Sequence, residues 1–154
     1  MSLAMQREQY ENLIKQIVYL EENISEISRE AADAGYFASE AAAGEFFGEY
    51  VGKVESLFKD LKIVEKEAFR GDTKLNRLPF IVLDSSFTLT RGGSVRDFCH
   101  LSYEIYRDSK CPVKHIYFLS EAGIALLLRQ SGERVQTDIG EGLCEYIVGS
   151  ITIK

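Results

Sequence analysis

Residues 116–135 read IYFLSEAGIALLLRQSGERV, and this stretch combines signals for a strand, a helix and a second strand. Val113 to Leu119 is an apolar run typical of a strand. Ser120 is a suitable N-cap for a short helix through Arg129, and Val135 to Ile139 predicts the next strand. The stretch therefore predicts a sheet with one helix against it.

The segments on either side extend this sheet. Short runs of β-forming or alternating residues predict further strands at Phe80 to Leu83, Ser86 to Thr90, Cys99 to Ile105 and Cys144 to Ile153. Glycine-containing turns separate them at residues 91–94 and 140–142. We predict a small antiparallel sheet with one short helix over residues 79–154, joined to the first half by a short polar linker over residues 71–78.

The first half has a helical period. Apolar residues recur at alternating steps of three and four, which is typical of a coiled-coil seam. The first seam is Tyr10, Leu13, Ile17, Leu20, Ile24, Ile27 and Ala31, and the second is Phe47, Tyr50, Val54, Leu57, Leu61, Val64 and Ala68. Small residues and a glycine between Asp33 and Glu40 let the chain reverse. Residues 1–70 are therefore predicted to form an antiparallel helical hairpin.

Two points about this hairpin stay open at the level of the sequence. The apolar stripes could instead pack on the second half, as two sides of one globule. Gly44, Gly48 and Gly52 recur at steps of four, and this spacing fits either a close approach of two helices or a loosened hairpin tip.

Composition and charge limit the function. Of the 154 residues, 45% are hydrophobic and 27% charged, which indicates a globular protein, and the formal net charge is −6. Residues 1–70 carry 8 Lys and Arg against 14 Asp and Glu, whereas residues 71–154 carry 10 of each sign. The acidic excess argues against nonspecific binding of nucleic-acid phosphates, and we expect no direct sequence-specific DNA binding.

Neither the cysteines nor the histidines form a recognisable metal motif. Cys99, Cys111 and Cys144 contain no CxxC pair and indicate reduced cytoplasmic thiols. His100 and His115 fall on separate predicted strands, without a carboxylate at ligand spacing, and are predicted to be structural. A Cys99–His100 nucleophile pair is excluded because neighbouring strand residues point to opposite faces. We predict no metal and no cofactor.

The sequence has no stretch of roughly 20 apolar residues, as a membrane span requires. Its first ten residues also lack the apolar core of a signal peptide. The expected location is the cytoplasm.

The stretch quoted above resembles the C-terminal domain of the bacterial Gre transcript-cleavage factors, a family of transcription elongation factors. The matching positions are Ser120, Gly123, Ala125, Leu126, Leu127, Gly132 and Val135. Arg129 stands for the family's Lys, while Glu121 replaces its Pro and Leu128 its Gly.

The resemblance implies an FKBP-like C-terminal domain after a long helical hairpin, and RNA polymerase as the partner. In this scheme the C-terminal domain docks at the rim of the polymerase secondary channel and the hairpin enters the channel. The docking residues carried over by the match are Ser120, Gly123, Ala125, Leu126 and Arg129.

The hairpin tip departs from the family. The resemblance places Gly35, Tyr36, Phe37, Ser39 and Glu40 at the tip, where the cleavage factors present two acidic side chains that help to hold a catalytic Mg²⁺. Here Tyr36 and Ser39 occupy those two positions. The protein is thus predicted to bind polymerase without stimulating its transcript cleavage, and to have no catalytic activity of its own.

Three nearby carboxylates are candidates to replace the missing acids: Asp33, Glu40 and Glu45. Each also fits an ordinary solvated position near a helix end. Any Mg²⁺ would belong to the polymerase active site.

Two other functions stay open. An FKBP-like fold is compatible with prolyl isomerisation, for which Tyr103, Tyr106, Tyr117 and Phe118 offer aromatic side chains. Alternatively, exposed Tyr36 and Phe37 make the hairpin a self-association surface of an adaptor protein.

Overall fold

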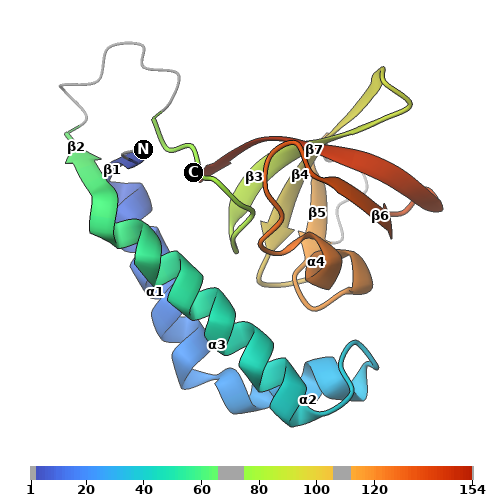
Figure 1. Ribbon diagram of the computed structural model, residues 1–154, viewed down its shortest axis with the longest axis horizontal. Helices are drawn as coiled ribbons and strands as arrows, with labels where there is room; N and C mark the ends of the chain where they lie inside the picture. Colours follow the sequence, from blue (N-terminus) through green and yellow to red (C-terminus); the bar gives the residue numbers. More distant parts are fainter. Residues whose placement is uncertain (1–2, 66–74, 106–111, 154) are drawn as a thin grey trace. The chain divides into compact units, whose positions relative to one another are not determined.

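The computed structural model describes residues 3–65, 75–105 and 112–153. The chain divides into two compact units, Met1–Asn76 and Arg77–Lys154, which are described separately below (Figure 1). The architecture is mixed α+β: helices dominate the first unit, and the second is built on a five-stranded sheet. No helix within the described ranges is long and apolar enough to cross a membrane.

The described residues of the first unit form three α-helices, where the sequence predicted two. They are α1 (Arg7–Glu22), α2 (Ile24–Asp33) and α3 (Glu40–Leu57), and α3 runs back along the other two (Figure 1). Most of the predicted seam residues are buried, namely Leu13, Ile17, Leu20, Ile27, Ala31, Phe47, Tyr50 and Val54. The apolar stripes therefore supply the core of this unit.

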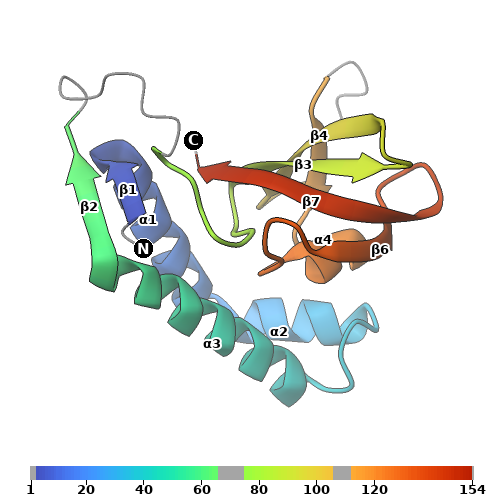
Figure 2. The same ribbon diagram turned by 45° about the horizontal axis from the view of Figure 1, so that its top comes forward.

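The first predicted helix breaks at Asn23. The Asn23 side-chain amide donates to the carbonyl of Tyr19 at 2.8 Å, and its backbone N–H donates to the same carbonyl at 3.1 Å. Asparagine competes in this way for backbone groups that a continuous helix would use. As a result α2 takes a different direction from α1 (Figure 2).

The second predicted helix also ends early. It stops at Leu57 and passes through the 3₁₀ turn η1 (Phe58–Asp60) into strand β2 (Leu61–Val64), which pairs in parallel with β1 (Leu3–Gln6). The predicted continuation through Leu61 and Val64 as a helix is wrong, and Ala68 lies outside the described residues. Leu61 pairs with Leu3, a residue distant in sequence that the local period did not reveal.

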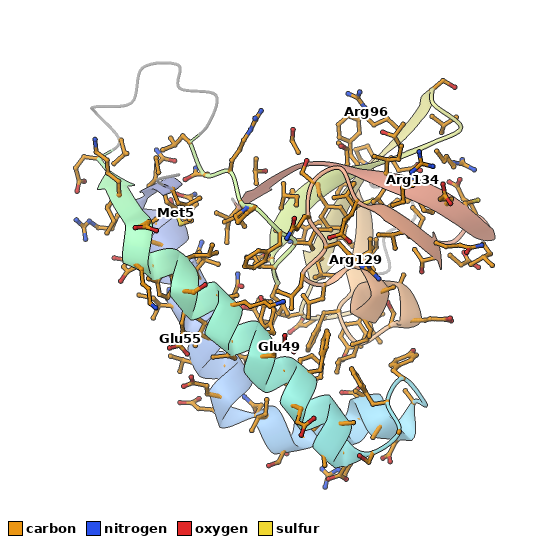
Figure 3. The ribbon with its side chains drawn as sticks, viewed as in Figure 1. Met5, Glu49, Glu55, Arg96, Arg129 and Arg134 are labelled. Atoms are coloured by element: carbon orange, nitrogen blue, oxygen red, sulfur yellow. The ribbon has the colours of Figure 1, made fainter. Side chains whose placement is uncertain are left out.

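Two side chains stabilise the β1–β2 end of this unit. Met5 of β1 is fully buried (Figure 3). Asn76 borders β1, since its N–H donates to Ala4 O at 2.9 Å and its Oδ1 accepts from Gln6 N at 3.0 Å.

One of the three glycines spaced four residues apart lies at a close approach of two helices. A Cβ added to Gly44 would lie 3.6 Å from Ser28 Oγ of α2, whereas Gly48 and Gly52 have no neighbour within 4 Å. Of the two interpretations left open above, Gly44 fits close helix packing, and the other two glycines face open space.

The second unit is a sheet in the order β5-β4-β3-β7-β6. Its strands are β3 (Ser85–Arg91), β4 (Val95–Ser102), β5 (Lys114–Tyr117), β6 (Arg134–Asp138) and β7 (Leu143–Ile153). The short helix α4 (Glu121–Leu126) packs beside β5 and β6 (Figure 2). Buried Leu89, Leu101, Leu126 and Tyr146 form part of its core.

The prediction of a purely antiparallel sheet is wrong at one pair. The β3–β4, β3–β7 and β6–β7 pairs are antiparallel, but β4 and β5 are parallel, with His100 opposite His115. Strand β5 therefore runs in the same direction as its neighbour β4.

The predicted strand at Phe80 to Leu83 is absent, although the segment is apolar. Ile81, Val82 and Leu83 are fully buried in an irregular segment. Backbone bonds from Ile81 N to Arg129 O (2.9 Å) and from Leu128 N to Ile81 O (2.8 Å) satisfy its polar groups. Burial, and not sheet pairing, explains this apolar run.

Helix α4 is shorter than predicted. It ends at Leu126 because Leu127, with a φ of −58° and a ψ of 130°, leaves the helical conformation and Leu128 has a φ of 70°. Arg129 therefore follows the helix and does not belong to it.

Candidate functional site

The reversal between α2 and α3 is built by Gly35. Its φ of +86° is left-handed, its N–H donates to Ala32 O at 3.0 Å, and the next N–H, of Tyr36, donates to Ala31 O at 3.1 Å. This is the Schellman arrangement, which ends helices at a left-handed glycine. The predicted turn position is confirmed.

Ser39 begins the returning helix. Its side-chain oxygen accepts a hydrogen bond from Ala42 N at 3.1 Å, and its backbone is extended, as expected of an N-cap. Ser39, which the resemblance places at the second acidic position, therefore stabilises the start of α3. Removing such an N-cap lowers the free energy of unfolding by about 1 kcal/mol.

The tip aromatics are less exposed than the sequence predicted. Tyr36 and Phe37 are both half-buried. The Phe37 ring lies 5.2 Å from Phe46 and 6.1 Å from Phe47 of α3, measured between ring centroids. Such contacts remove apolar surface from water. The expectation of two exposed aromatic residues at the tip is thus wrong, and Phe37 anchors the turn to α3.

The three candidate carboxylates occupy different positions along α2 and α3. Glu40 lies in the first turn of α3, where the helix dipole favours a negative charge. Asp33 ends α2, where the dipole disfavours it, and both it and Glu45 are exposed. Among the residues that the structure describes, no three His, Cys, Asp or Glu side chains gather into a group that could hold a metal ion.

In the second unit, Ser120 and Gly123 build the corner between β5 and α4. Ser120 Oγ accepts from Gly123 N at 3.0 Å and donates to Tyr117 O at 2.6 Å, which confirms the predicted N-cap. A Cβ on Gly123 would lie 2.2 Å from Tyr117 O and 2.6 Å from Phe118 O. Only glycine fits at this position.

Of the remaining predicted docking residues, Arg129 is the charged and exposed one. Leu126 is fully buried and Ala125 is half-buried. Arg129, labelled in Figure 3, donates to Ala125 O at 2.9 Å and pairs with Glu133 at 3.0 Å. Its side chain remains 44% exposed. Hydrogen bonds from Arg129 and from Gln130 N lower the pKa of Glu133.

Cys99 is unsuited to nucleophilic chemistry. Burial raises the pKa of its thiol to about 12, with a further contribution from the charge of Asp97. It faces the core, whereas its neighbour His100 faces the opposite side of β4, in agreement with the exclusion of a Cys99–His100 pair. Cys111 lies outside the described residues.

The aromatic residues considered for an isomerase differ in burial. Phe118 is buried, Tyr103 and Tyr117 are half-buried, and Tyr106 lies outside the described residues. A hollow on the sheet is lined instead by residues that include Phe87 and Phe98.

Sequence reasoning missed a carboxylate partner for a histidine. His100 Nε2 lies 2.7 Å from Asp84 Oδ1, and His100 Nδ1 lies 2.9 Å from Ser86 Oγ. The prediction considered only the spacing of metal ligands in the sequence, so it did not include this contact. The available signal was the alternation along two strands, which places Ser86 directly opposite His100 once the register is known.

No protein-family model matches the chain, and no curated protein matches it. Among solved structures it is similar to GreA factor homolog 1 (Gfh1) of Thermus thermophilus, with 19% identity over 98% of this chain and 99% of that chain, at a TM-score of 0.42. It is also similar to the prokaryotic transcription elongation factor GreA/GreB from Nitrosomonas europaea, with 14% identity over 98% and 99% of the two chains and a TM-score of 0.44. Gfh1 of Thermus aquaticus is 18% identical over 98% of each chain, at a TM-score of 0.39.

Proposed function

We propose that this protein is a Gre-like factor that binds bacterial RNA polymerase and does not stimulate transcript cleavage. The observation that carries the proposal is the motif at residues 120–135. Its Ser120 and Gly123 build the β5–α4 corner, and its Arg129 follows that corner as an exposed cation. The motif thus combines positions that shape the domain with one position available to a partner.

The second part of the proposal follows from the tip. Mg²⁺ prefers hard oxygen ligands, and two carboxylates at the reversal would supply them. Here the corresponding positions hold half-buried Tyr36 and the N-cap Ser39, whose hydroxyl already accepts a backbone hydrogen bond. A protein with this tip occupies the channel as a modulator or competitor.

Binding to purified bacterial core polymerase tests the first part. We expect a complex at micromolar concentration that an authentic cleavage factor displaces, because both occupy one docking site. Arg129→Glu should weaken the complex by reversing the exposed charge after α4. Arg134→Glu is the matched control, since Arg134 is an exposed arginine of β6 that pairs with Glu145 outside the matching positions (Figure 3).

Absence of a complex at micromolar concentration would rule out the proposal. An equal loss of affinity in the two variants would show that binding follows general charge, and Arg129 would lose its assigned role.

Restoring the tip acids tests the second part. We expect Tyr36→Asp with Ser39→Asp to give measurable cleavage in a backtracked polymerase complex, while the unmodified protein gives none. Aspartate is chosen at position 39 because it is also a good N-cap, so α3 keeps its first turn. Single-residue variants provide the controls, as each supplies one carboxylate only.

Cleavage by the unmodified protein that disappears in Glu40→Ala would contradict this assignment. It would show that Glu40 has taken the role of the missing acids.

A further inference from the structure

Three polar side chains form a hydrogen-bonded chain at the start of β3. Asp84 Oδ1 lies 2.7 Å from His100 Nε2, and His100 Nδ1 lies 2.9 Å from Ser86 Oγ. A carboxylate accepts from the Nε2–H of a neutral imidazole, which leaves Nδ1 as the acceptor for the serine hydroxyl. The serine thus faces a base that a carboxylate orients, which is the relation required of an activated nucleophile.

The fold holds these groups in place at the β3–β4 ladder. Ser86 and His100 are direct register partners, so their side chains share one face of the sheet. Asp84 has a left-handed φ of 64°, and its N–H donates to Leu101 O at 2.8 Å. Aspartate is among the non-glycine residues that adopt this conformation most often, and the hydrogen bond to Leu101 holds Asp84 beside β4.

A hollow of about 270 Å³ lies beside Ser86. Its lining includes Ser86, Thr88, Phe98, Val113, Ser150 and Thr152. Phe87 and Cys99, which are buried, complete its lining.

The lining combines apolar surface with hydroxyl groups. Phe98 is 57% exposed, although it lies in the middle of a strand. Thr152 is the register partner of Ser86 on the other side, and its hydroxyl has no hydrogen-bond partner within the described residues. This hydroxyl is available as a donor to a carbonyl oxygen.

We propose that Ser86 is a nucleophile for small carboxylic esters with an apolar acyl or aryl group. Ser86 Oγ bonds to the ester carbonyl carbon while its proton passes to His100 Nδ1, and Asp84 stabilises the imidazolium that forms. The ester C–O bond then breaks, and His100 returns the proton to the leaving alkoxide. Water, deprotonated by His100, hydrolyses the acyl-serine, which releases the carboxylic acid and restores Ser86. This activity is independent of polymerase binding.

A fluorophosphonate probe tests the nucleophile directly, because it forms a stable P–O bond with an activated serine and releases fluoride. The full chain is incubated with the probe, and the adduct is located by intact mass and peptide mapping. We expect one adduct on Ser86 and none in Ser86→Ala. Ser102→Ala should label as the wild type does, since Ser102 also lies beside a histidine Nδ1, at 3.2 Å, but is not part of the hollow lining.

The rate at which the probe labels Ser86 tests the roles of His100 and Asp84. His100→Gln and Asp84→Asn should each slow it by about 10²–10⁴-fold, the usual contribution of a general base. Asparagine tolerates a left-handed φ, so Asp84→Asn should keep the backbone and lose the charge. Circular dichroism melting checks that each variant is folded. Absence of an adduct, an adduct on another residue only, or labelling of Ser86 at an unchanged rate in His100→Gln would each overturn the proposal.

Discussion

Gly123→Ala is expected to prevent the second unit from folding stably. The added Cβ would lie 2.2 Å from Tyr117 O, 2.6 Å from Phe118 O and 2.7 Å from Phe118 C. These are backbone atoms, and hydrogen bonds hold them, since Phe118 N donates to Ser102 O and Ser120 N to Tyr117 O, both at 3.0 Å. Overpacking typically costs about 1–3 kcal/mol, and contact with backbone atoms that cannot rotate away places this substitution at the upper end of that range. Urea unfolding gives the change in free energy.

Gly132→Ala is the matched control. Gly132 also has a positive φ, +90°, but no atom lies within 4 Å of its added Cβ. Backbone strain alone should then cost about 1–2 kcal/mol. If Gly123→Ala lowered the free energy of unfolding no more than Gly132→Ala does, α4 could shift away from β5 to make room for the added Cβ. That result would contradict the prediction.

Local signals predicted the start of α4 and the turn after α2 correctly. Ser120 and Gly35 each act within a few residues, by capping a helix or by adopting a left-handed φ, so their effect is readable from the sequence. The strands β3, β6 and β7 were predicted to within a residue or two for a similar reason. Each is a continuous run between turn residues.

Features that depend on distant partners were not predicted. Leu61 and Val64 fit a helical seam and a strand equally well, and their pairing with β1 decides between the two. The apolar segment ending at Leu83 became an irregular buried segment because its hydrogen bonds go to the chain after α4. In such segments tertiary contacts, and not the local secondary-structure propensity, determine the conformation.

The candidate sites show the same difference between local signals and distant partners. The tip and the motif at residues 120–135 lie in continuous stretches, so their residues were named from the sequence. The contact of Asp84 with His100 joins residues 16 positions apart on opposite sides of a hairpin. It required the register of β3 and β4, which no composition or spacing rule supplied.

Phe47→Ala is expected to destabilise the first unit and leave the second unchanged. Phe47 is fully buried in α3, and its ring lies 5.2 Å from Phe46 and 6.1 Å from Phe37, so truncation removes core packing and the anchor of the tip together. Replacing a buried phenylalanine by alanine costs about 3–5 kcal/mol. Hydrogen exchange measured by mass spectrometry should show lost protection in α1 to α3 and unchanged protection in β3 to β7. Phe46→Ala, at a half-buried position, should cost less. Equal loss of protection in both units would contradict the assignment of a separate core to each.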